Sequence, residues 1–211
     1  MTCKKFESVI AYHCSPVLMG MKPSNLVSFS KEKMPELPKL AALYSENLKG
    51  EGICMEIICS CRRHYLVFVY RPGMLGTCLQ QIEARKLLKA HGYPEKGTLE
   101  EMISYLKSRF EVSEDFPHEI GLFLGYPTED VEGFHRYGGN ECKLCGYWKV
   151  YGDVEAARRL FADYDMCREF ISAQIQKGYS ILQVVGMKHL CKFASEEIYQ
   201  ASLTERKRET A

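Results

Sequence analysis

The sequence predicts a single α+β domain in which a mixed or antiparallel sheet packs with several helices. Two observations favour this class. Apolar residues make up 46% of the 211-residue chain, which is enough for one large core. Segments of helical and of strand periodicity intermix along the chain, and no linker-like stretch separates them. We therefore place one domain at residues 1–203 and a charged tail at 204–211.

Several helices are predicted from the spacing of apolar residues and from helix-end signals. Apolar residues at 37, 40, 41, 44 and 48 share one helical face, so a helix is expected over 37–48. The same spacing predicts one helix over 74–91. Thr98 and Glu101 form a capping-box pattern, which predicts a further helix starting there. A last helix is expected from Met187 onward.

The sheet is predicted from three segments rich in β-favouring residues. Alternating apolar residues followed by a β-rich run predict a hairpin over 53–70. Further strands are expected at 146–151 and at 179–186. Between these two, Asp153 is expected to cap a long helix that Gly178 ends.

Composition and charge argue against two classes of binding partner, nucleic acids and membranes. The chain carries 28 Lys and Arg against 27 Asp and Glu, so its net charge of +1 gives no general attraction for nucleic acid. Its longest apolar stretches, at 53–61 and 66–70, are much shorter than the ~20 residues that span a bilayer. The N-terminal residues contain no apolar signal-peptide core. We expect a cytoplasmic protein that binds neither nucleic acid nor membrane.

The ten cysteines are expected to be reduced thiols, because disulfide frameworks belong to small exported domains. Cys78, Cys167 and Cys191 fall within apolar helical patterns and are expected to pack in the core. Cys59 and Cys61 are expected on the inward face of the predicted hairpin.

Three stretches carry a resemblance to a known family. They read HCSPVLMGMKPSNL at 13–26, FPHEIGLFLGYPTEDVEGF at 116–134 and CGYWKVY at 145–151. Together they resemble a family of functionally uncharacterised bacterial proteins of about this length, common in anaerobes. The likeness extends to roughly Gly178 and leaves out Cys142. It implies a cytosolic bacterial protein and assigns no activity to any residue.

The first candidate site is a thiol catalytic group formed by Cys14, His118 and Asp153. Cys14 is expected at the start of a helix and His118 at the start of a buried strand, with Asp153 following the next strand. This order is similar to that of papain-like thiol enzymes. The alternative is that Pro117 opens a short helix, which leaves His118 exposed and makes Asp153 only a helix cap.

The second candidate site is a metal centre at Cys142 and Cys145, for which zinc or iron would be the metal. The spacing of this pair suits a tight turn that directs both sulfurs inward. Further ligands would have to come from other cysteines or histidines of the chain, of which the candidates are Cys54, Cys59, Cys61, His64 and His135. A dithiol redox pair is the alternative for the same two residues.

The third candidate is a binding face for a small molecule or a protein. Lysines beside aromatic rings can hold an anion or a flat ligand, although such rings are also common core residues. The residues proposed for this face are His13, Lys22, Asn25, Glu119, Tyr147, Trp148 and Lys149.

Overall fold

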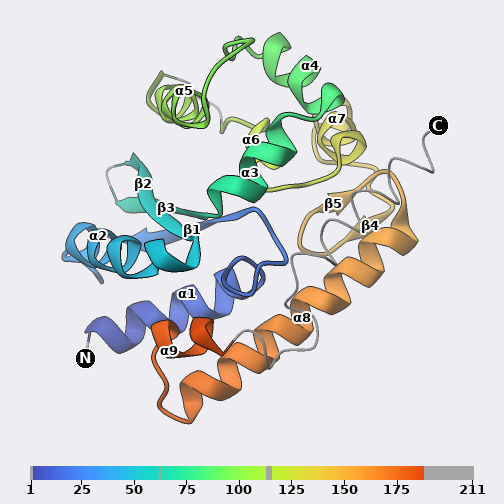
Figure 1. Cartoon of the computed structure of the whole chain (residues 1–211). Helices are drawn as coiled ribbons and strands as arrows, with labels where there is room; N and C mark the ends of the chain where they lie inside the picture. The colour runs from blue at the N-terminus through green and yellow to red at the C-terminus, as the bar shows by residue number, and fades with distance from the viewer. Residues whose placement is uncertain (1, 62, 113–115, 188–211) are drawn as a thin grey trace.

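The fold is that of an α+β protein, seen in a computed structural model that describes residues 2–61, 63–112 and 116–187 (Figure 1). The main sheet contains β1 (Ser24–Ser30), β2 (Cys54–Ser60) and β3 (His64–Tyr70), and a small hairpin contains β4 (Leu144–Cys145) and β5 (Lys149–Val150). The helices are α1 (Thr2–Leu18), α2 (Leu37–Leu48), the 3-10 turn η1 (Lys49–Glu51), α3 (Pro72–Leu79), α4 (Ile82–Ala90), α5 (Leu99–Val112), α6 (Ile120–Phe123), α7 (Thr128–Tyr137), α8 (Val154–Gln176) and α9 (Ile181–Gly186).

The main sheet is antiparallel, with β3 between β1 and β2. The hairpin predicted over 53–70 is therefore confirmed as β2 and β3. Pairing shifts between Ile57 and Cys59, so Ile58 forms a bulge that breaks the strict alternation of side chains. The strand ends at Ser60, so Cys61 lies beyond it and is exposed, and its prediction as an inward-facing residue is wrong.

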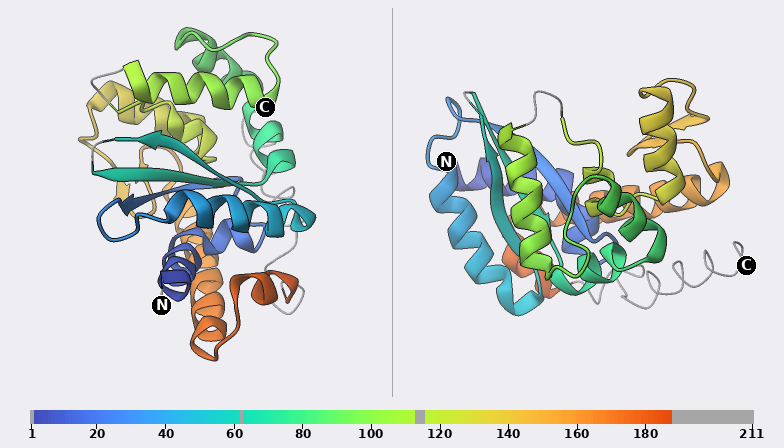
Figure 2. Two further views of the ribbon diagram at one scale, coloured as in Figure 1. Left: turned by 90° about the vertical axis from the view of Figure 1, so that its left-hand side faces the viewer. Right: turned by 90° about the horizontal axis from the view of Figure 1, so that it is seen from above.

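The sheet separates two apolar cores, and the left view of Figure 2 shows helices on both of its faces. Successive residues of β3 alternate between them: Val67 and Val69 belong to the first core and Phe68 to the second. The first core is closed by α1, α2, α8 and α9, and the second by helices α3 to α7. The molecule is thus a sheet covered by helices on both faces.

Arg71, directly after β3, fastens the end of α1 to the sheet. Its guanidinium donates to the carbonyl oxygens of Val17 and Leu18, at 2.6 and 2.8 Å, and to that of Glu51 at 3.0 Å. The last carbonyls of a helix have no partner within the helix, so a cation at this position satisfies them. This contact fixes the segment that follows α1, where several candidate site residues lie.

Several predicted helix ends are confirmed. The helix over 37–48 is α2, and Thr98 with Glu101 forms the reciprocal capping bonds that start α5. Asp153 caps α8 by accepting a hydrogen bond from the Ala156 amide at 2.9 Å. Gly178, with a φ of +95°, follows the end of α8.

Three predicted elements are wrong in type or length. The helix over 74–91 is two helices, because Gln81 is extended between α3 and α4. The strand over 179–186 is instead α9, which begins with a capping box formed by Ser180 and Gln183. The strand over 146–151 shortens to β5, because the residues before it form the turn that joins β4.

Some predictions lie outside the described residues: the helix beyond Met187, Cys191 and the tail at 204–211. Within the described residues, no helix combines the length and the apolar character needed to cross a membrane.

Candidate functional site

Cys14 lies inside α1, one turn before the C-terminus of the helix, and not at a helix start as predicted. Its side chain is fully buried in the first core. Burial raises the pKa of the thiol to about 12, because a thiolate would lose its hydration there, and nearby Lys22 offsets only part of this effect. The setting therefore favours the neutral thiol.

His118 and Asp153 are not placed as partners of this thiol. The residues that follow His118 form α6, a helix and not the predicted strand, and His118 is exposed beside the ring of Phe134 at 5.0 Å between centroids. Asp153 acts as the cap of α8. The side chains that influence the Cys14 thiol are instead Lys22 and Asn25. The structure does not assemble the papain-like group.

Three of the predicted binding residues meet at the end of α1. The Lys22 ammonium donates to Asn25 Oδ1 at 2.7 Å, and Asn25 Nδ2 donates to the His13 carbonyl, also at 2.7 Å. Lys22 is only 3% exposed, with Nζ 5.3 Å from the centre of the Tyr126 ring. Burial lowers the pKa of Lys22 to about 8. Lys22 lines neither of the two cavities described below.

Tyr147 lies next to this group. The Arg168 guanidinium packs over the rings of Tyr12 and Tyr147, at 4.7 and 4.9 Å from their centroids, and the Tyr147 hydroxyl donates to Asp165 at 2.9 Å. Burial, and secondarily the Arg168 charge, lower the pKa of His13. Cation–ring contacts thus link α1 to α8 and to the β4–β5 turn.

Trp148 and Lys149 have contacts that explain them as structural residues. The Trp148 indole donates to the buried carboxylate of Asp130 at 2.6 Å and stacks on Tyr126. Asp130 also accepts from the amides of Tyr151 and Gly152. The Lys149 ammonium donates to the Gly139 carbonyl. These bonds hold α7 against the β4–β5 hairpin.

Glu119 lies apart from the other predicted binding residues, on the side of the second core. It is 2% exposed, and its Oε1 accepts from the Tyr93 hydroxyl at 3.3 Å and from Arg109 Nε at 3.0 Å. Glu119 lines a small cavity of about 220 Å³ between α4, α6 and α7. His91 and His135 also line it, with their rings edge to face at 5.6 Å.

Cys142 and Cys145 flank the start of the small hairpin, where Cys142 is half-buried and Cys145 is exposed. In the parts of the chain that the structure describes, no group of three or more His, Cys, Asp or Glu side chains comes together to hold a metal. The expected third and fourth ligands are elsewhere; His135, for example, faces His91. Every described cysteine is a free thiol. Among them, Cys61 is exposed, and backbone hydrogen bonds lower the pKa of its thiol.

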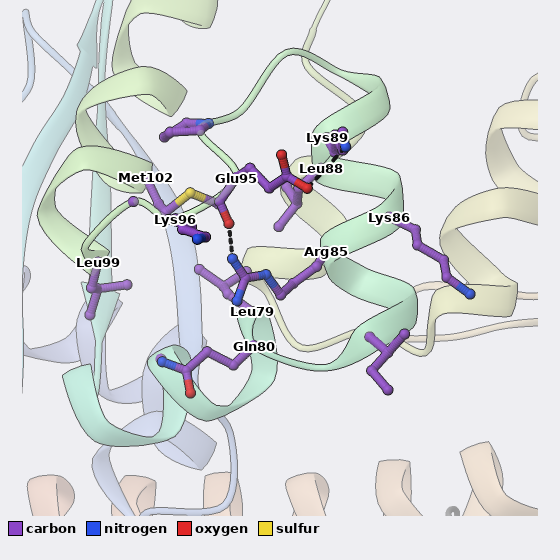
Figure 3. Close-up of a pocket in the computed structure, with 14 residues that line it drawn as sticks. Leu79, Gln80, Arg85, Lys86, Leu88, Lys89, Glu95, Lys96, Leu99 and Met102 are labelled. Carbon is purple, nitrogen blue, oxygen red and sulfur yellow. Dashed lines mark hydrogen bonds and ion pairs between the residues drawn. The ribbon is translucent and has the colours of Figure 1, made fainter.

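Sequence reasoning missed a second cavity, which is larger than the one beside Glu119. It is a groove of about 720 Å³ between α3, α4, the connection after α4 and α5 (Figure 3). Its walls contain the apolar side chains Leu79, Leu88, Leu99 and Met102 and the cationic side chains Arg85, Lys86, Lys89 and Lys96. We call it the basic groove.

One acidic residue, Glu95, lines the basic groove. Its carboxylate pairs with Lys89 at 2.9 Å, and its carbonyl oxygen accepts a hydrogen bond from Arg85. Figure 3 shows both side chains directed toward Glu95 from α4. Among the described residues, Lys86 and Lys96 form no ion pair. The cationic residues at 85, 86 and 89 lie close together in the sequence. They share a groove with Lys96 only because the connection after α4 returns along that helix.

Comparison with known proteins gives a family and no activity. No curated protein and no solved structure matches the chain. Residues 10–185 match the model of a family described as a protein of unknown function, DUF3793. The three stretches that suggested a resemblance lie wholly within this match, and they meet in space: Ser24 donates to the Phe123 carbonyl, and Tyr126 stacks on Trp148. The chain belongs to the DUF3793 family.

Proposed function

We propose that this chain is a ligand-binding protein whose basic groove takes an organic anion with an apolar body. The observation that carries the proposal is the combination of an apolar floor with a cationic rim in one cavity of about 720 Å³. Cavities of roughly 300–1,000 Å³ with apolar walls and a few directed polar groups are typical of small-molecule sites.

The charge of the groove supports an anionic ligand. Four cationic side chains and one acidic side chain line it, whereas the whole chain has a net charge of only +1. Lys96 has no ion pair among the described residues, and Lys89 has only the exposed Glu95 as a partner. Exposed ion pairs contribute little to stability, so a ligand anion can replace Glu95 at low cost.

The floor of the groove supports an apolar body on that ligand. Leu79, Leu88 and Met102 are each less than a tenth exposed, and they border the cavity beside the cations. Burying apolar ligand surface there contributes about 25 cal/mol per Å² before the costs of association. A ligand with charge alone would leave this surface uncovered.

Thiol chemistry has less support than ligand binding. The buried Cys14 has a neutral thiol, and its neighbours are Lys22 and Asn25 and not the predicted imidazole. The Cys142 and Cys145 pair lacks further metal-binding side chains among the described residues. Neither cysteine site borders the basic groove.

The test uses 1-anilinonaphthalene-8-sulfonate, a fluorescent anion with an apolar body, and decanoate as a competitor. We expect saturable binding that decanoate displaces and that weakens as salt is added. The double variant Lys89→Glu/Lys96→Glu should bind at least about 10-fold more weakly, because two attractive charges become repulsive.

The matched control is Lys33→Glu/Lys39→Glu, which changes the net charge equally at two exposed residues outside the groove. It should bind like the wild type. Non-saturable binding, or an equal loss in both double variants, would show that the groove is not the site.

A further inference from the structure

We propose that the small cavity between α4, α6 and α7 is a second binding site, which takes a free α-amino acid with an apolar side chain. The cavity holds about 220 Å³, which is below the size typical for drug-sized ligands. It lies on the other side of α4 from the basic groove, since Leu87 and His91 border it whereas Arg85 and Lys89 border the groove.

The first argument is the buried carboxylate of Glu119. Both of its hydrogen bonds, from Tyr93 and Arg109, end on Oε1, and no described residue donates to Oε2. Glu119 is only 2% exposed and lines the cavity. Buried acceptors normally have a donor, and a ligand ammonium would supply one.

The second argument is the arrangement of opposite charges at the cavity. Glu132 and Arg136 lie one turn apart on α7 and both line it, yet the structure shows no ion pair for either of them among the described residues. A ligand that carries an ammonium and a carboxylate on one carbon can meet Glu119 and Glu132 with the first and Arg136 with the second. A simple amine or a simple carboxylate uses only half of these groups.

The third argument is the apolar part of the wall. Leu87, Leu122 and Val131 border the cavity beside the edge-to-face rings of His91 and His135. This surface suits an aliphatic or aromatic side chain. The two imidazoles do not indicate a metal here, because no third metal-binding side chain joins them within the described residues.

The experiment is saturation-transfer-difference NMR and calorimetric titration of the full chain with L-leucine, L-valine and L-phenylalanine. At least one of these amino acids should bind saturably. Its decarboxylated amine and its deaminated acid should each bind at least 10-fold more weakly. If none of the three binds, or if either analogue binds as well as its parent, the proposal is overturned.

Variants locate the site. Glu132→Gln and Arg136→Gln should each weaken amino-acid binding at least 10-fold, and both positions are exposed, so the fold tolerates the change. The matched controls are Glu169→Gln and Arg159→Gln, at exposed positions of α8, and they should bind like the wild type. Equal loss in the controls, or no loss at 132 and 136, would contradict the assignment. Binding of 1-anilinonaphthalene-8-sulfonate to the basic groove should remain unchanged in all four variants, so the two sites are tested separately.

Discussion

Lys22 and Cys14 share a buried position at the end of α1, and both are shifted toward their uncharged forms. Burial lowers the pKa of Lys22 from 10.5 to about 8 and raises that of Cys14 from 9.0 to about 12. Near neutral pH the folded protein therefore keeps one ammonium in its interior, with Asn25 as its hydrogen-bond partner. A buried charge carries a desolvation cost.

This cost gives a prediction for the dependence of stability on pH. The pKa of Lys22 is lower in the folded chain than in the unfolded chain, so the buried ammonium destabilises the fold below pH 8. The penalty is relieved as the pH rises from about 8 to 10.5. Lys22→Met removes the titration, so its stability advantage over the wild type should shrink over this interval, by up to about 3 kcal/mol.

Urea denaturation of both proteins at pH 7, 8, 9 and 10 measures this difference. Cys14 is present in both proteins, so its own titration between pH 9 and 12 largely cancels. A difference in the free energy of unfolding that stays constant with pH would contradict the account of Lys22.

At the scale of elements, Asp130 joins α7 to the β4–β5 hairpin. Its carboxylate is 3% exposed and accepts from the Trp148 indole and from two backbone amides. Its place in the first turn of α7 also lets it interact favourably with the helix dipole. The three hydrogen bonds give it a second role that depends on the hairpin being folded beside it.

Asp130→Ala should lower the free energy of unfolding by about 2–4 kcal/mol, because it leaves one buried indole donor and two half-buried backbone amides without this acceptor. Glu129→Ala is the matched control, since Glu129 is an exposed acid in the same turn and changes the dipole interaction equally. The free energy of unfolding of Glu129→Ala should fall by less than about 1 kcal/mol. Urea titrations followed by far-UV circular dichroism compare the two, and equal losses would assign the effect to the dipole alone.

The sequence predicted those elements whose ends carry local signals. Thr98 with Glu101 and Asp153 mark helix starts through bonds within a few residues, and the structure has both. Ser180 and Gln183 form the same kind of cap, but the β-favouring residues after Ser180 led to a predicted strand. The break at Gln81 carries neither Gly nor Pro, so no local pattern indicated it.

The candidate sites likewise include residues whose proximity the sequence could suggest and cavities that it could not. His13, Lys22 and Asn25 come together because a short connection links α1 to β1, which sequence proximity could suggest. The basic groove and the small cavity could not be predicted, because each is formed by helices whose relative placement is set by the second core. Glu119 was named from the sequence, but its partners Tyr93 and Arg109 were not.

At the scale of the whole molecule, β3 belongs to both cores. Val67 faces the first core and Phe68 the second. If the sheet separated from one core, the side chains of the other core would therefore be exposed as well. This arrangement predicts one cooperative unfolding transition for the two cores, even though the chain has 211 residues.

Leu18→Ala in the first core and Leu106→Ala in the second test this prediction, since both side chains are fully buried. Each should destabilise the protein by about 2–5 kcal/mol and shift a single calorimetric peak. The calorimetric and van't Hoff enthalpies should agree in both variants. Two resolved peaks, of which each variant moves only one, would show that the cores unfold independently.

The bond between Trp148 and Asp130 has a practical consequence. Trp148 is the only tryptophan of the chain, and its indole is anchored to α7, the helix that supplies Glu132 and Arg136 to the small cavity. Indole emission depends on the hydrogen bonding and polarity around the ring. The protein therefore contains an intrinsic optical probe at α7, and a shift in its emission spectrum would report a rearrangement of this helix without any added label.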